Sequence, residues 1–396
     1  GGALKVLGED VTEELDYLPG RIVVNRIVRP LVGAPYDPAA AADARAGLLS
    51  LGVFSRVGAA ELLLTAPGRG LLVYQVEEAA ANAFEGAFGY QGEGQGAMGF
   101  ARLHIGNLAG TARQADVIWE GRGNGISFFD LHYAEPFVAG LPVRGDLNFS
   151  QELQGAAYTR TDAGLSATMG TGRGVSATLG LGAGRVIVGA GPVASSSRWG
   201  VRLELERSAG IPLASVGALR MGSYRVGVLA GLDFLSETLR GSRLQEQGRL
   251  STLGLDAGLT RPTSGRRFFS LALQSRARFS GDRAIPVYDL FSVGGVQSLR
   301  GYREDAFRAA HLALLRAEYG LVFPRSRLFA FLDQAVFYRS RGPLDSTGIP
   351  ETRYRAGYGL GTSYVSPLGE LALLLGWGEG TGPLDAKLHL LLLSRF

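Results

Sequence analysis

From about Asn82 to the end of the chain, the dominant sequence pattern is an alternation of apolar and polar residues with a period of two. In VRLELER, residues 201–207, the valine and leucines hold the odd numbers, and charged residues hold the even ones. The same alternation recurs in residues 142–153 and 268–279. Successive side chains of a strand point to opposite faces, so this pattern predicts strands with one apolar and one charged face.

The length of these segments indicates what the apolar face meets. They run for about 9–13 residues, the length that a tilted strand needs to cross a bilayer, and no helical pattern interrupts them. In lipid only a closed barrel leaves no backbone group unpaired at a sheet edge. At roughly 20 residues per strand, residues 81–396 predict a transmembrane antiparallel β-barrel of about 16 strands, so the fold class is mainly β.

Composition argues against several function classes. The 40 basic and 36 acidic residues nearly cancel and form no block of one sign, which argues against a nucleic-acid partner. Cysteine is absent, and this excludes thiolate metal sites and disulfides. Residues 94–99 match a dinucleotide fingerprint only formally, because alternation and not a helix follows. The four histidines have no metal spacing, and no Gly-x-Ser-x-Gly occurs. We therefore expect no catalytic residue, metal or cofactor.

Residues 1–80 carry a different pattern, which predicts a small α/β domain. Residues 38–51 read as a helix, with Asp37 as N-cap and Gly52 as the stop. Residues 61–64 and 71–76 read as strands around the turn APGRG. Residues 4–7 form a short apolar run, and 21–31 fit either a strand or a helix. The predicted order is strand, helix, helix, strand, strand.

One loop does not look like ordinary connecting sequence. Residues 291–305 read FSVGGVQSLRGYRED, and five alternating segments follow, at about 310–321, 327–338, 353–366, 369–378 and 386–396. This arrangement resembles the sixth-loop motif of the BamA/TamA-type superfamily of outer-membrane barrels. That superfamily also holds two-partner-secretion transporters and patatin-like autotransporters. The residues that carry the resemblance are Gly294, Gly295, Leu299, Arg300, Gly301 and Tyr302.

Three further stretches carry the resemblance beyond the loop. Residues 357–378 resemble the family's penultimate hairpin with its Ser-Pro-x-Gly turn. GAPYDP at 33–38 and LLSLGVFSRV at 48–57 resemble a POTRA domain, the periplasmic module of such proteins. The resemblance therefore implies one POTRA domain over residues 1–80 in front of the barrel, and it implies that Phe396 is the terminal strand signal.

The resemblance further implies that the loop folds into the barrel lumen and that its arginine docks on acidic residues of the inner wall. Alternation in 311–324 turns Arg316 and Glu318 inward, and Asp333 is the sole acid of 327–338. The planar fork of a guanidinium suits two carboxylates. We expect Arg300 to pair with Glu318, Asp333 or both.

As function, the resemblance implies a non-enzymatic protein of the bacterial outer membrane that assists insertion or translocation of client polypeptides. Its POTRA would lie in the periplasm and capture clients by adding them to a sheet edge. The expected partners are outer-membrane lipid, an unfolded or nascent client, and periplasmic chaperones or accessory subunits. Two alternatives stay open: the translocator part of a patatin-like lipase whose enzyme domain lies upstream of Gly1, and a passive porin.

Overall fold

The computed structural model describes residues 2–6, 21–51, 53–66, 69–78, 82–90, 97–123, 125–170, 174–210, 222–242, 245–281, 285–296, 298–339, 351–366 and 369–393. The chain divides into two compact units. One holds residues 1–155 and 163–173 with residue 396, and the other holds 156–162 and 174–395. Among the described residues, no helix is both long and apolar enough to cross a membrane.

The described residues up to Glu78 form an α/β arrangement. Its elements are β1 (Gly2–Val6), α1 (Arg21–Val28), η1 (Arg29–Leu31), α2 (Pro38–Ser50), β2 (Phe54–Val57), β3 (Glu61–Ala66) and β4 (Arg69–Glu78). The antiparallel sheet has the order β1-β4-β2, and β3 also pairs with β4. The helix predicted at 38–51 is present, and the ambiguous segment 21–31 is helical. Strand β2 is one element more than the sequence predicted.

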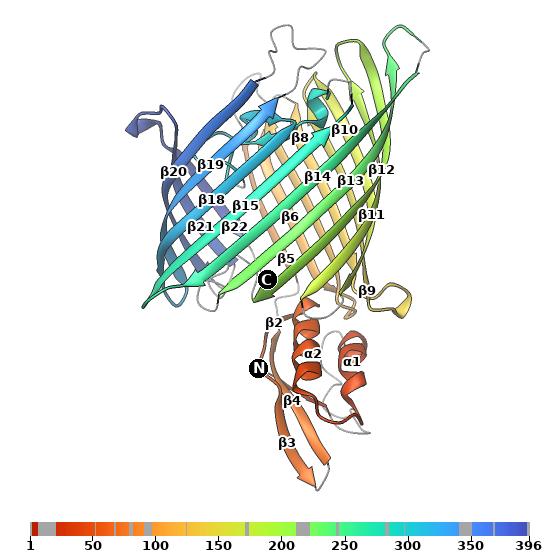
Figure 1. Ribbon diagram of the computed structural model, residues 1–396, viewed down its shortest axis with the longest axis vertical. Helices are drawn as coiled ribbons and strands as arrows, with labels where there is room; N and C mark the ends of the chain where they lie inside the picture. The colour runs from red at the N-terminus through yellow and green to blue at the C-terminus, as the bar shows by residue number, and fades with distance from the viewer. Residues whose placement is uncertain are drawn as a thin grey trace. The chain divides into compact units, whose positions relative to one another are not determined.

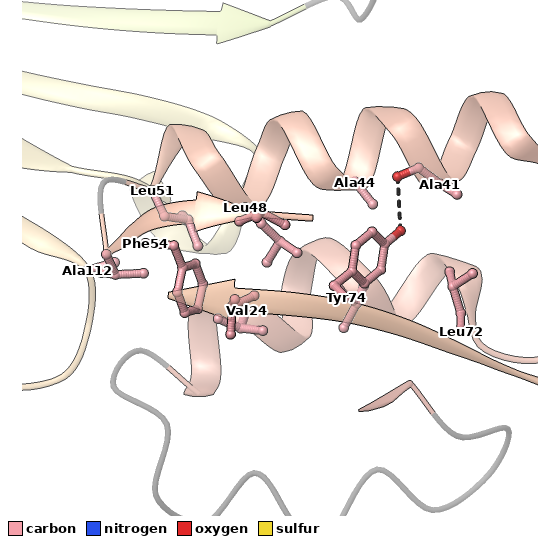
Figure 2. Packing of buried hydrophobic residues seen from close by; sticks show 13 residues of the cluster. Val24, Ala41, Ala44, Leu48, Leu51, Phe54, Leu72, Tyr74 and Ala112 are labelled. Carbon is pink, nitrogen blue, oxygen red and sulfur yellow. Dashed lines mark hydrogen bonds between the residues drawn. The ribbon is translucent and has the colours of Figure 1, made fainter. Parts of the chain in front are cut away.

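Local chemistry explains this small core. Asp37 caps α2, since its Oδ1 accepts a hydrogen bond from the Ala39 amide at 2.8 Å. The side chains of Val24, Leu48 and Tyr74 are fully buried between the helices and the sheet. Figure 2 shows Tyr74 reaching from its strand to helix α2, where its hydroxyl donates to the Ala41 carbonyl at 2.9 Å. That bond satisfies the polar end of a buried tyrosine.

The rest of the chain is dominated by one large sheet of sixteen strands. They are β5 (Asn82–Tyr90), β6 (Ala97–Leu108), β7 (Arg113–Gly123), β8 (Ile126–Glu135), β9 (Val143–Gln154), β10 (Tyr158–Gly170), β11 (Val175–Val188), β12 (Val193–Gly210), β13 (Ser223–Leu239), β14 (Gln245–Pro262), β15 (Arg267–Phe279), β18 (His311–Val322), β19 (Ser326–Arg339), β20 (Glu351–Ser366), β21 (Gly369–Gly378) and β22 (Lys387–Leu393). Each strand neighbours the next in chain order, and β11 to β15 lie side by side in Figure 1.

A mainly β chain with a large antiparallel sheet is therefore confirmed. Short 3-10 turns occur at η2 (Val138–Gly140) and η4 (Pro383–Asp385). All five segments predicted after the glycine-arginine loop are strands, β18 to β22. The predicted faces are also observed in β18, where Leu315 and Tyr319 are 37% and 52% exposed while Leu314 is fully buried. Alternation in the sequence thus becomes alternation between the two faces of the sheet.

The connection between β15 and β18 carries the motif. It contains η3 (Val287–Asp289), β16 (Phe291–Val293) and β17 (Phe307–Ala309), and the two short strands pair with each other. We call residues 285–296 and 298–309 the strap. Its side chains pack into buried clusters with side chains of β13, β14, β18 and β19.

Candidate functional site

The strap turns sharply at three glycines of the motif. Gly294, Gly295 and Gly301 have φ of +122°, +96° and +89°, a backbone region that glycine adopts far more readily than other residues. The first turn is closed by Ser298, whose Oγ accepts from the Gly294 amide at 2.8 Å. Leu299 follows and is fully buried beside Val293. These contacts leave Arg300 at a fixed position on the strap.

Arg300 contacts two acids on adjacent strands. Its Nε and Nη2 donate to Oδ2 and Oδ1 of Asp333 at 2.8 and 2.6 Å. Its backbone amide donates to Oδ2 of the same carboxylate at 3.0 Å. Its Nη1 donates to Oε1 of Glu318 at 2.5 Å. The two acids lie on β19 and β18, and both project from the face opposite the exposed leucines. The structure therefore brings Arg300 together with both predicted acids.

Burial strengthens this cluster. Arg300 is 4% exposed and Asp333 is fully buried. Loss of either residue would therefore leave an uncompensated charge in the interior. Burial alone would lower the pKa of Arg300, but the hydrogen bonds and charges of Asp333 and Glu318 raise it above the ordinary arginine value. Its guanidinium also lies 4.0 Å from the ring centre of Phe331. Glu318 is shared, because its Oε2 accepts from Arg327 Nη1 at 2.9 Å.

The strap backbone lies against a surface made of glycine. Gly357 pairs with Gly378, and Gly359 pairs with Gly376, on the neighbouring strands β20 and β21. We call these four residues the glycine patch. A Cβ on Gly357 would collide with the Arg300 carbonyl. A side chain at Gly357 would therefore push the strap away from the sheet.

Gly301 and Tyr302 complete the contact with the glycine patch. A Cβ on Gly301 would overlap the Trp377 carbonyl group. The Tyr302 hydroxyl donates to the Ala356 carbonyl at 3.0 Å and accepts from the Glu379 amide at 2.9 Å. Burial raises the pKa of this phenol. All six motif residues predicted from the sequence thus lie in the strap, and Phe396 lies outside the described residues.

Sequence reasoning missed three parts of this site. It did not single out Arg327, the glycine patch, or the residues Tyr288 and Asp289 at the start of the strap. Alternating glycines at 357, 359 and 361, and again at 376 and 378, were the available signal for the patch. Arg316 was expected to point inward, and its side chain is half-buried.

Histidines and acids also meet elsewhere in the first unit. His104 Nδ1 lies 2.6 Å from Oδ1 of Asp116, and His132 Nε2 lies 2.9 Å from Oδ1 of Asp146. They form a row of alternating histidines and aspartates on the neighbouring strands β6 to β9. In the described part of the chain, no group of three or more His, Cys, Asp or Glu residues has the arrangement of a metal site.

Comparisons with known proteins agree with this description. Residues 238–383 match the Omp85 superfamily domain, a range that includes the strap, Glu318, Asp333 and the glycine patch. No curated protein sequence matches the chain significantly.

Three solved structures share the fold at low sequence identity. BamA from Haemophilus ducreyi lacking POTRA domains 1–3 is 16% identical, with 97% of this chain and 83% of that chain covered and a TM-score of 0.57. CdiB from Escherichia coli is 16% identical, with 96% and 74% covered and a TM-score of 0.61. CdiB from Acinetobacter baumannii is 15% identical, with 87% and 65% covered and a TM-score of 0.53.

Proposed function

Because residues 238–383 match the Omp85 superfamily domain, we propose that this chain is an outer-membrane barrel that assists insertion or translocation of client polypeptides. Residues 81–396 form the barrel in this proposal, and residues 1–80 form a periplasmic POTRA domain. The observation that carries the proposal is the docked strap. Its arginine is held by Asp333 and Glu318 on one face of a sheet whose other face is apolar.

The exposed leucines support a lipid-facing exterior. In the second unit, Leu181, Leu203, Leu253 and Leu360 are between 46% and 59% exposed. Soluble proteins rarely expose so much contiguous apolar surface. The opposite face of these strands carries paired charges such as Arg276 with Asp256, 2.6 Å apart. This distribution suits a barrel with lipid outside and water inside.

The β3 strand supports a site for capturing clients. Among the described strands it pairs with β4 alone, and all six of its residues are exposed. Leu63 and Leu64 are 50% and 81% exposed, the kind of surface that soluble proteins avoid at a sheet edge. An extended client segment would add to this edge through backbone hydrogen bonds, and the leucines would contact its apolar side chains.

Site-specific photo-cross-linking tests the proposal. A photoreactive amino acid at Leu64 is expected to cross-link an unfolded outer-membrane polypeptide supplied with the reconstituted protein. The matched control is the same label at Asp43, which is exposed on helix α2 of the same domain. Equal cross-linking at both positions, or steady large conductance in planar bilayers with no client adduct, would favour a passive porin instead.

A further inference from the structure

The strap makes a second set of buried contacts before the motif begins. Tyr288 and Asp289 are 3% and 1% exposed, although they lie in η3, a single 3-10 turn within the connection between β15 and β18. Their partners come from β10, β12, β13 and β15. None of these strands contributes to the Arg300 cluster, whose acids lie on β18 and β19.

Three arginines hold the strap at this end. Arg198 Nη1 donates to Oδ1 of Asp289 at 2.8 Å. Arg160 Nη1 donates to the Tyr288 carbonyl at 2.6 Å, and Arg278 Nη1 donates to the Asp289 carbonyl. The strap is therefore gripped through its backbone as well as through a side chain.

A residue of the large sheet holds two of these arginines in place, and this contact does not depend on the strap. Asp162 on β10 accepts from Arg160 Nε and from Arg198 Nη2, each at 2.5 Å. Charge-assisted hydrogen bonds of this kind are strong and directional. The guanidinium groups are thus oriented before the strap arrives.

Tyr288 adds a contact of another kind. Its hydroxyl donates to Oε1 of Glu237 on β13 at 3.1 Å. Its ring packs edge-on against Tyr158 of β10, with ring centres 6.1 Å apart. Burial keeps this phenol protonated by raising its pKa, so the hydroxyl remains a donor.

The chemistry of Asp289 indicates that this residue does more than fill space in the interior. Its Oδ2 is buried with no hydrogen-bond partner among the described residues. Burying a carboxylate with one oxygen unsatisfied is costly, and an apolar residue of similar size would avoid this cost. The pairing with Arg198 is what this residue offers that an apolar residue would not.

We propose that Tyr288 and Asp289 are positioning residues that form a second anchor, which fixes the strap to β10, β12, β13 and β15 and thereby presents Arg300 to Asp333 and Glu318. This inference deepens the proposed role of the strap and rests on it. The ten residues 290–299 then span the distance between two anchors. If one anchor lets go, the other keeps the released end at high effective concentration near its site.

Val293 reports on the segment between the anchors. It belongs to the strap and is fully buried, and the sequence contains no cysteine, so Val293→Cys creates a protein with a single buried thiol. Its rate of labelling by a maleimide in detergent measures how often the strap detaches. A second reporter, Ala134→Cys on β8, is 2% exposed, lies outside the strap clusters and measures global unfolding.

Labelling is compared for Asp289→Ala, Arg300→Ala and both together in the Val293→Cys background. Each single change should accelerate labelling by about tenfold or more, the equivalent of a charge-assisted hydrogen bond. Because the segment comes free only when both anchors release, the combined acceleration should approach the product of the two. Tyr288→Phe, which removes only one hydroxyl, should act in the same direction with a smaller factor.

The matched control is Asp256→Ala, which removes a carboxylate that pairs with Arg276 on the neighbouring strand of the wall. It should leave Val293→Cys labelling unchanged, and in every strap variant Val293→Cys should label faster than Ala134→Cys, because detachment of the strap does not require global unfolding. The proposal is overturned if Asp289→Ala acts no differently from Asp256→Ala. It is also overturned if the combined variant labels no faster than Arg300→Ala alone, or if the two reporters label at the same rate, which would mean that Val293 is exposed only by global unfolding. No client is present, so these outcomes are independent of the client cross-linking test.

Discussion

Asp333 should stabilise the docked strap more than Glu318 does, although the sequence alone allowed either acid to be the main partner of Arg300. Three of the four hydrogen bonds that Arg300 donates to these acids go to Asp333. Asp333 is fully buried, whereas the Glu318 side chain is 16% exposed and also binds Arg327. The perturbations are Asp333→Asn and Glu318→Gln, which keep side-chain volume and remove one charge each.

The expected costs follow from this geometry. In Asp333→Asn the amide nitrogen would face donors of Arg300, so a buried charge loses its partner. That loss should lower the free energy of unfolding by about 3–5 kcal/mol. In Glu318→Gln one charge-assisted hydrogen bond to Arg300 is weakened, and the expected loss is about 1.5–3 kcal/mol. The first variant should therefore be the less stable by roughly 2 kcal/mol.

Urea unfolding in detergent micelles measures both losses. The midpoint of the heat-induced mobility change on semi-native gels gives an independent ranking. Arg300→Lys serves as the reference, because it keeps the charge and loses the planar fork. If Glu318→Gln proves as destabilising as Asp333→Asn, the assignment of Asp333 as principal partner is wrong.

Three further predictions concern other parts of the molecule. Gly301→Ala should destabilise the docked strap by about 2 kcal/mol or more in urea unfolding, because φ is positive and its Cβ would overlap the Trp377 carbonyl. In the proposed barrel Leu203 faces lipid, so Leu203→Arg should lower stability in refolding assays with lipid vesicles by about 2–4 kcal/mol, the cost of an arginine near the bilayer midplane. Burial raises the pKa of both Tyr288 and Tyr302, so strap stability should be complete below about pH 10, the ordinary phenol value, and fall as the pH rises above it. Replacing both tyrosines by phenylalanine should remove that dependence, measured as urea midpoints at neutral and alkaline pH.

Matched controls separate these effects from general damage. Gly380 has φ of +75° with no atom near its missing Cβ, so Gly380→Ala should cost less than Gly301→Ala. Arg202 precedes Leu203 on the opposite face, and Arg202→Gln should leave vesicle refolding nearly unchanged. A larger effect from either control would contradict the corresponding reasoning.

Much of the fold could be predicted because its signals are local. Alternation depends only on neighbouring residues, so β18 to β22 and the inward direction of Glu318 followed from the sequence. Asp37, followed by Pro38 and a run of alanines, likewise identified helix α2. Strand β2 was missed because its four residues follow the helix almost directly and are too short for a periodic signal.

The candidate site was only partly predictable because it depends on distant segments. The sequence narrowed the partners of Arg300 to two acids but could not rank them, since the ranking depends on strand register and on the path of the strap. Asp289 pairs with Arg198, which lies 91 positions earlier in the chain. No local pattern links two such residues, and the role of the alternating glycines becomes evident only with the strap lying on them.

The positions of the two sets of strap contacts along the chain have a consequence for biogenesis. The residues that hold Tyr288 and Asp289 all precede the strap in the sequence; they are Arg160, Arg198, Glu237 and Arg278. Asp333 and the glycine patch follow the strap. A chain that is delivered with its N-terminus first can form the contacts of Tyr288 and Asp289 early. The contacts of Arg300 must wait until the last hairpins are present. The strap can therefore dock completely only after the hairpins before and after it have formed, so complete docking distinguishes the fully assembled protein from its assembly intermediates.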